Sequence, residues 1–323
     1  MPFVQTGGRW LRGLPRHHAF PYSPAPGPVW PLQETSVIPS AFEYHAPTSL
    51  PDAIALLGRF GDEAKLLAGG HSLLPMMKLR FATPAHLIDL GRIPGLRGIT
   101  EVGSEVHIGA MTTENELVWS KLLADKVPLL VEGARWIADP QVRYRGTVGG
   151  DISHGDPAND HPALMLALDA SFVLRGPQGE RVVKASDFFL GLYATELQPG
   201  EVLTRIQVPI PPPGTGWAYE KLKRKIGDFA TAAAAVLLAL DRGRVARVSI
   251  ALTNAGATPL KAAAAEAALL GRALDELSLS EAARLAMEIC DPVADQRGDA
   301  DYKRAMAGEM TRRALLKAQQ RAA

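Results

Sequence analysis

Apolar residues in the first half of the chain occur partly in short runs and partly with helical spacing. The sequence Thr48-Ser49-Leu50-Pro51-Asp52 offers a hydroxyl cap and an acidic first turn, and apolar side chains then recur every three to four residues up to Gly61, which predicts a helix. Short apolar runs between turn residues predict strands at residues 65–68, 87–90 and 106–110. Helical spacing returns at residues 114–123 and 127–138.

A further helix and three strands are predicted before a proline-rich break. Asp156 followed by Pro157 is typical of a helix cap and first helical position, so a helix is expected to begin there, with its apolar body at residues 163–168. Further strands are predicted at residues 170–175, 181–184 and 202–209. The sequence PPPG at residues 211–214 interrupts every periodic pattern and indicates a domain boundary.

Beyond this boundary the pattern changes to three strands followed by alanine-rich helices. The strands are predicted at residues 217–225, 231–240 and 245–254, and the helices at residues 259–274, 280–289 and 301–320. A chain of 323 residues is long enough for two hydrophobic cores. We therefore predict an α+β protein with one domain at residues 38–213 and a smaller domain, a three-stranded sheet plus helices, at residues 214–323.

Residues 1–37 differ from the rest. They are rich in proline, carry several arginines before the first acidic residue, Glu34, and lack the apolar run of a secretory signal. We interpret them as a disordered extension, with a targeting peptide as the alternative.

Composition excludes several classes of protein. With 35 basic and 34 acidic side chains, the net charge of +1 gives no basic surface for nucleic acid. The single cysteine, Cys290, excludes an internal disulfide and a four-thiolate iron–sulfur cluster within the chain, and it favours a cytoplasmic location. No apolar run reaches the roughly 18 residues that a transmembrane helix needs.

Two loops of similar sequence are the main candidates for a binding site. Ala68-Gly69-Gly70-His71-Ser72 and Thr147-Val148-Gly149-Gly150-Asp151 each combine a glycine pair with hydroxyl or acidic side chains. Without β-carbons, backbone N–H groups can turn toward an anion, so we expect both loops to bind a diphosphate. Ordinary tight turns are the alternative. Neither a Rossmann nor a P-loop glycine pattern is present.

Three separated motifs carry a family resemblance. AGGHSLLPMMKLR at 68–80, ADPQVRYRGTVGGDISHGDPANDHPA at 138–163 and KLKRKIGDFATAAAAVLL at 221–238 resemble the FAD-binding medium subunit of the xanthine dehydrogenase and aerobic carbon monoxide dehydrogenase family. The resemblance covers roughly residues 38–320. It implies a two-subdomain, vanillyl-alcohol-oxidase-like domain that binds FAD non-covalently, with a smaller C-terminal domain closing over the flavin.

The resemblance also assigns individual residues. It implies that both glycine loops surround the diphosphate and ribityl chain, and that Ile137 lies beside the isoalloxazine. Asp160 and Leu197 match positions that contact the cofactor. Lys223 matches a basic residue near the ring, although a solvated strand face would also explain it. Phe229 falls where many relatives have tyrosine, so stacking remains but a hydroxyl hydrogen bond is lost.

A metal-dependent hydrolase is the competing function. His154, Asp156, Asp160 and His161 lie within eight residues and have the side chains of a metal site. The predicted helix start sets them on different faces, and no H-E-x-x-H pattern supports them. A non-catalytic nucleotide-binding scaffold is a third class.

The resemblance implies partner chains as well. A small [2Fe-2S] subunit and a large molybdopterin subunit would complete the enzyme, usually as a dimer of heterotrimers, and this chain would carry electrons from the clusters to quinone, NAD or another acceptor. The sequence leaves the substrate, the acceptor and peripheral membrane association of the complex open.

Overall fold

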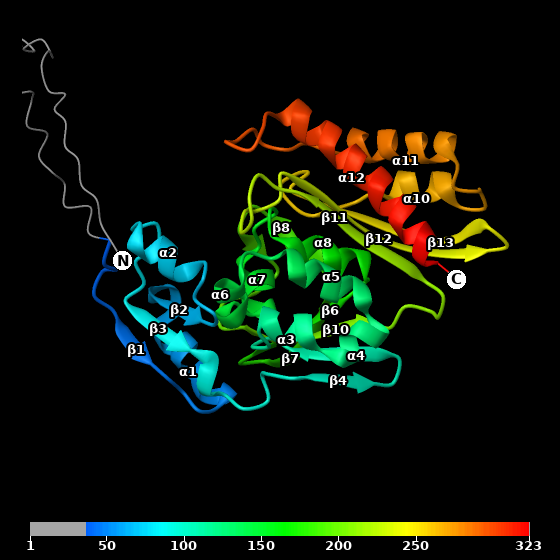
Figure 1. Ribbon diagram of the computed structural model, residues 1–323. Coiled ribbons are helices and arrows are strands. Elements are labelled where there is room, and N and C mark those ends of the chain that lie inside the picture. The colour runs from blue at the N-terminus through cyan, green and yellow to red at the C-terminus, as the bar shows by residue number, and fades with distance from the viewer. Residues whose placement is uncertain (1–36, 323) are drawn as a thin grey trace, which may run out of the picture. The chain divides into compact units, whose positions relative to one another are not determined.

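The computed structural model describes residues 37–322 (Figure 1). The predicted extension at residues 1–37 therefore lies, except for Val37, outside the described residues. Among the described residues no helix combines the length and apolar character that crossing a membrane requires.

The first sheet is small and parallel. Its strands are β1 (Glu43–His45), β3 (His86–Asp89) and β2 (Ala64–Leu67), in that spatial order. Helix α1 (Leu50–Phe60) begins where the Ser49 hydroxyl accepts the N–H of Asp52, as its sequence predicts, and its Ala53 is buried in the same core as Ile88. The remaining elements are a 3-10 turn at Gly61–Glu63, helix α2 (Leu73–Lys78) and a 3-10 turn at Leu90–Arg92.

The second sheet is antiparallel and has the order β4-β5-β10-β6-β7. Its strands are β4 (Ile99–Val102), β5 (Glu105–Gly109), β10 (Val202–Pro209), β6 (Ser171–Gly176) and β7 (Gly179–Lys184). The helices are α3 (Glu114–Trp119), α4 (Lys121–Lys126), α5 (Pro128–Trp136), α6 (Pro140–Arg145), α7 (Val148–His154), α8 (Asp160–Ala167) and α9 (Ala185–Phe188). A hairpin of β8 (Phe189–Gly191) and β9 (Ala194–Thr195) follows α9.

Two helix predictions in this region need correction, and helix α7 was missed. The helix predicted at residues 114–123 is two helices, because Ser120 leaves the helical conformation and caps α4. The helix predicted to begin at Asp156 begins at Asp160 instead, because Asp156 accepts the N–H of Ala158 in a local turn. Helix α7 was not predicted, since its first turn contains the second glycine pair.

The C-terminal sheet has four strands where three were predicted. The order is β11 (Gly216–Leu222), β12 (Ala232–Asp241), β13 (Arg244–Thr253) and β14 (Leu260–Lys261), all antiparallel. Strand β14 pairs with β13 at Ala251 and Leu252 and is too short to give an alternating pattern. Three helices follow: α10 (Ala263–Leu269), α11 (Glu276–Glu288) and α12 (Ala300–Arg321).

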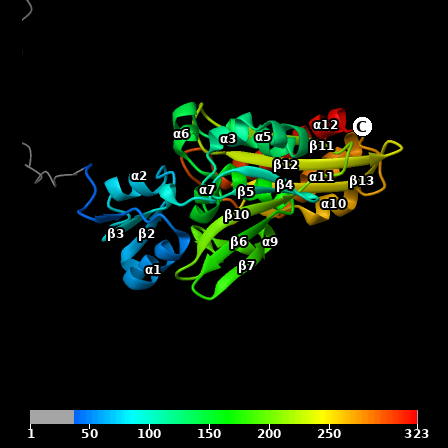
Figure 2. The same cartoon turned by 90° about the horizontal axis from the view of Figure 1, so that it is seen from below.

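Both faces of the C-terminal sheet are buried, which explains the nearly continuous alanine run of β12. Ala233 and Ala235 face the large core that contains α5 and α8, whereas Ala232 and Ala234 face the core of α10–α12. Figure 1 shows the sheet between these two groups of helices, and Figure 2 shows the same strands from below. The α+β prediction is confirmed, and the two sheets before residue 211 match the two subdomains that the resemblance implies.

Candidate cofactor site

A cavity of about 1300 Å³ is lined on one side by the two glycine segments and on another by residues at β11 and the segment that follows it. Most of the predicted site residues line it, namely Ala68, Gly69, Gly70, His71, Ser72, Ile137, Thr147, Gly149, Gly150, Asp151, Asp160, Leu197 and Phe229. Val148 is fully buried behind the wall, and Lys223 is not part of the lining. The cavity is large enough for a dinucleotide, since typical ligand pockets measure about 300–1,000 Å³.

The first glycine loop keeps its backbone donors available. It connects the end of β2 to the start of α2, and Gly70 turns the chain with φ of +75°, which favours glycine. The N–H groups of Gly70, His71 and Ser72 donate to no acceptor in the described part of the chain. This loop therefore has the free donors that a diphosphate needs.

The second glycine pair is not a loop but the first turn of α7, which corrects the prediction. Thr147 caps this helix, and the N–H groups of Val148, Gly149 and Gly150 donate to Thr112 O, Ala110 O and Thr147 Oγ1. A Cβ on Gly149 would lie 2.4 Å from Ala110 Cβ. These glycines therefore allow close packing against the end of β5, and their N–H groups are not free for an anion.

The two glycine segments form one wall because they touch each other. A Cβ on Gly69 would lie 2.7 Å from Gly146 Cα, and one on Gly150 would lie 3.4 Å from Ala68 Cβ. Segments that are far apart in the sequence thus approach at backbone distance, which only residues without large side chains allow.

Asp151 contributes a buried carboxyl oxygen, Oδ2, to this wall. Burial raises the pKa of its carboxyl to about 8, and its Oδ2 has no hydrogen-bond partner among the described residues. A pKa above neutrality favours the protonated carboxyl, which can donate a hydrogen bond to a ligand. Nearby, His161 contacts the Glu114 carboxylate at 2.6 Å. Burial alone would lower the pKa of the His161 imidazole, but this carboxylate raises it to about 9.

A second buried cluster joins the two domains beside the cavity. Asp160 Oδ2 accepts from Lys221 Nζ at 2.7 Å, and Asp160 Oδ1 accepts from the Tyr219 hydroxyl at 2.6 Å. Both charged side chains are less than a tenth exposed. Lys221 lines the cavity, whereas Lys223 places its ammonium 4.7 Å from the centre of the Trp136 ring. The pKa of Lys223 is lowered by burial and by Lys221.

The loop that contains Phe229 is held by an ion-pair network that sequence reasoning missed. Asp228 accepts from Arg297 at 2.7 Å and from Arg224 at 3.1 Å, and the Arg297 guanidinium lies 5.5 Å from the Phe229 ring centre. Gly227, Asp228 and Phe229 all line the cavity. Arg297 is 69 residues from Asp228, so no local motif connects them.

The four residues of the alternative metal site have separate partners. His154 packs against the Tyr193 ring, Asp156 caps its own turn, Asp160 binds Lys221, and His161 binds Glu114. They form no group of converging ligands within residues 37–322. The hydrolase alternative therefore lacks its site.

Comparison with known proteins decides the family. Residues 40–211 match the FAD binding domain in molybdopterin dehydrogenase, and residues 217–318 match the CO dehydrogenase flavoprotein C-terminal domain. The chain belongs to the FAD-binding medium subunits of molybdenum hydroxylases. The family provides the flavin site of a multi-subunit oxidoreductase.

Individual members of the family are similar over nearly their whole length. The carbon monoxide dehydrogenase medium chain of Hydrogenophaga pseudoflava is 58% identical, over 86% of this chain and 97% of its own. That of Afipia carboxidovorans is 53% identical, over 88% and 99%. A solved structure of the Hydrogenophaga enzyme, which lacks the Mo-pyranopterin moiety, superposes with a TM-score of 0.88 at 61% identity, over 88% of this chain and all of that one.

The cavity suits the FAD that defines this family. It combines free N–H donors at the first glycine loop, an unpartnered buried carboxyl at Asp151 and a cation at Lys221. An FAD molecule presents the complementary groups, namely a diphosphate, ribityl hydroxyls and a ring that becomes anionic on reduction.

Proposed function

We propose that this chain is the electron-transfer subunit of a carbon-monoxide-oxidising molybdenum dehydrogenase, and that it carries electrons from [2Fe-2S] clusters of a partner to an external acceptor. The observation that carries the proposal is the cavity shared by the first glycine loop and Lys221. The high identity to two carbon monoxide dehydrogenase medium chains favours carbon monoxide over aldehydes, purines and nitrogen heterocycles.

We assign the following tasks to residues of the cavity. The N–H groups of Gly70, His71 and Ser72 hold the diphosphate, because they are the unused donors at a turn. The protonated Asp151 donates to a sugar or ribityl oxygen. Ile137 and Leu197 provide apolar wall against the ring, as the resemblance implies.

Lys221 is the cation that this geometry places in the cavity. FAD supplies the ability to accept electrons singly and release them in pairs. A fixed positive charge favours the reduced, anionic cofactor, and the ion pair with Asp160 holds the Lys221 ammonium in place. Phe229 covers part of the cavity on a loop anchored by Asp228.

The other redox centres belong to partner subunits in this proposal. Cys290 is the single thiol of the chain, it is buried, and burial raises its pKa to about 11, so it is unsuited to hold a cluster. A small [2Fe-2S] subunit and a large molybdopterin subunit would supply these centres, in a dimer of heterotrimers. The acceptor is quinone, NAD or another oxidant.

The experiment compares the isolated chain with the complete complex. The isolated chain, loaded with FAD, should show flavin absorbance that bleaches with dithionite but not with carbon monoxide. The complex purified from its source should show the same bleaching with carbon monoxide. Bleaching by an aldehyde or a purine alone would contradict the substrate assignment.

Flavin absorbance that no reductant bleaches would indicate a non-catalytic nucleotide-binding scaffold. Carbon monoxide oxidation by the isolated chain would contradict the electron-transfer role, because that reaction would then need no molybdenum partner.

A further inference from the structure

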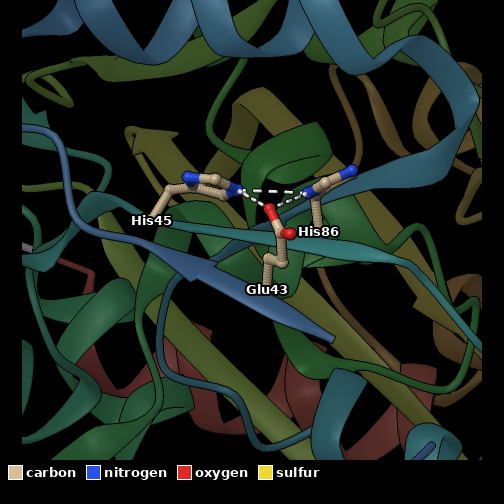
Figure 3. A group of neighbouring side chains, drawn as sticks. All are labelled: Glu43, His45 and His86. Atoms are coloured by element: carbon tan, nitrogen blue, oxygen red, sulfur yellow. Dashed lines mark hydrogen bonds and ion pairs between the residues drawn. The ribbon is translucent and has the colours of Figure 1, made fainter. Parts of the chain in front are cut away.

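A second cluster of ligand-type side chains lies outside the cavity, on the first sheet. Glu43, His45 and His86 bring one carboxylate oxygen and two imidazole nitrogens within 4.8 Å of one another (Figure 3). No other such group of three occurs within residues 37–322, and none of the three side chains lines the cofactor cavity.

The backbone places all three side chains on one face. Glu43 and His45 are two residues apart on β1, so strand alternation directs both to the same side. Strand β3 runs parallel to β1 with His86 paired to Glu43, which brings the His86 side chain to that side as well. The cluster is thus a direct result of sheet register.

The distances match three corners of a metal coordination tetrahedron. His45 Nε2 and His86 Nδ1 are 3.1 Å apart, and Glu43 Oε2 lies 3.8 Å and 3.4 Å from them. Ligands about 2.0–2.1 Å from a tetrahedral Zn²⁺ are separated from one another by about 3.3–3.4 Å. An ion could therefore enter with shifts of only a few tenths of an ångström.

The two rings are held in place before any ion binds. Phe60, at the end of α1, stacks on His86 with ring centres 3.7 Å apart and on His45 with centres 5.1 Å apart. The His86 and His45 side chains are 14% and 23% exposed, whereas the Glu43 side chain is 73% exposed. The site is thus fixed on its protein side and open to solvent at its carboxylate.

We propose that Glu43, His45 and His86 form a binding site for a divalent transition metal of the Zn²⁺ class, with a solvent molecule as fourth ligand. Two imidazoles and one carboxylate suit Zn²⁺, Cu²⁺ or Ni²⁺ and not Ca²⁺ or Mg²⁺, which prefer oxygen ligands alone. The metal links the edge strand β1 to the central strand β3. It thereby stabilises the sheet whose strand β2 leads into the first glycine loop.

Titration of the full chain with Zn²⁺ tests the site. The protein is first treated with chelator, and binding is then measured by calorimetry and by the shift of the melting temperature. We expect one Zn²⁺ per chain and a raised melting temperature. Co²⁺ bound in its place should show the strong visible absorption of a tetrahedral site.

Three variants test the ligands. H45Q and H86Q should each weaken Zn²⁺ binding by more than about 100-fold, since changes in the outer shell alone cost about 10–100-fold. E43Q should also weaken it, and this exposed side chain can be changed without disturbing the fold. The matched control is H107Q. His107 and Glu105, both on β5, form a pair with no third ligand beside them among the described residues. H107Q should bind Zn²⁺ like the wild type.

His17 and His18 lie outside the described residues, so H17Q/H18Q is titrated in parallel. Zn²⁺ binding that survives in H45Q/H86Q, or that is lost only in H17Q/H18Q, would overturn the proposal. Absence of Zn²⁺ binding by the wild-type chain would also overturn it. The cluster would then be only a hydrogen-bonded pair of histidines beside a glutamate. The site is independent of FAD, and these measurements need no enzyme activity.

Discussion

Asp160 forms an ion pair with Lys221 and accepts from the Tyr219 hydroxyl in a nearly water-free position between the two domains. Replacing it with asparagine leaves the Lys221 ammonium buried without a counter-charge. D160N should therefore lower the free energy of unfolding by about 3–5 kcal/mol in urea denaturation. The control is D169N, which removes an exposed pair with Lys184 and should change stability by less than about 1 kcal/mol.

The raised pKa values of Asp151 and His161 make stability depend on pH. The pKa of Asp151 is about 8 in the folded chain and that of His161 about 9, both above their ordinary values of 3.8 and 6.5. The folded state therefore holds protons that the unfolded chain has released, so stability falls as pH rises through these ranges. Each group contributes up to about 1.4 kcal/mol per pH unit.

The check is urea denaturation of wild type and D151N without FAD, from about pH 6 to about pH 8. Over this range the free energy of unfolding should fall more in the wild type than in D151N, because only His161 still makes the stability of D151N depend on pH. Parallel curves for the two proteins would show that Asp151 is ionised when folded.

Two lysines, Lys221 and Lys223, are candidates for the positive charge near the flavin. The resemblance points to Lys223, whereas only Lys221 lines the cavity. We expect K221M to lower the flavin reduction potential by tens of millivolts, where about 20 mV corresponds to 1 kcal/mol of a two-electron couple. K223M should lower it less. Spectroelectrochemical titration measures both, and a larger drop in K223M would favour the assignment from resemblance.

Sequence could locate the residues of the cavity but not their partners. The glycine motifs singled out Ala68–Ser72 and Thr147–Asp151 because each motif is local, and most of these residues line the cavity, although the second motif is a helix start and not a loop. The pairs Asp160–Lys221 and Asp228–Arg297 join positions 61 and 69 residues apart, and only tertiary packing brings these together. Single-sequence spacing carries no signal for such contacts.

Among the secondary-structure elements, helix packing at α5 and α8 depends on one glycine. A Cβ on Gly133 would lie 2.2 Å from Leu164 Cδ1, and Leu164 is fully buried. Gly58, in α1, has open space at the same point. G58A should raise the free energy of unfolding by about 0.5–1 kcal/mol through helix propensity. G133A should instead lower it by about 1–3 kcal/mol, because overpacking outweighs that gain. Thermal and urea unfolding of both variants, compared side by side, measure the difference.

Element predictions failed where local hydrogen bonds overrode propensity. Thr147 caps a helix at a glycine pair that has low helix propensity, and Asp156 forms a turn with Ala158, so that α8 begins only after Asn159 and without a side-chain cap. The long periodic segments, such as α1 and α12, were predicted well because apolar spacing repeats over several turns.

At the scale of the whole molecule, the cavity draws on both domains, so contacts far from the glycine loops should control cofactor release. R297M removes one of the two arginines that bind Asp228 and loosens the loop of Phe229. We expect FAD to dissociate about 10-fold faster, since hydrogen bonds to charged groups contribute about 1.5–3 kcal/mol. R313M removes an exposed helix pair with Glu309 and serves as control. Fluorescence of released FAD gives both rates, and equal rates would contradict the role of the loop.

The first and last residues of the C-terminal domain lie next to each other. A Cβ on Gly216, the first residue of β11, would lie 2.0 Å from Ala318 O and 2.7 Å from Ala322 N, at the end of α12. Neighbouring ends allow a circular permutant, in which residue 322 is joined to residue 216 and new ends are opened at the Asp241–Arg244 turn. The same closeness means that both ends of the domain are held at one point, while one face of its sheet stays covered by the core of α5 and α8.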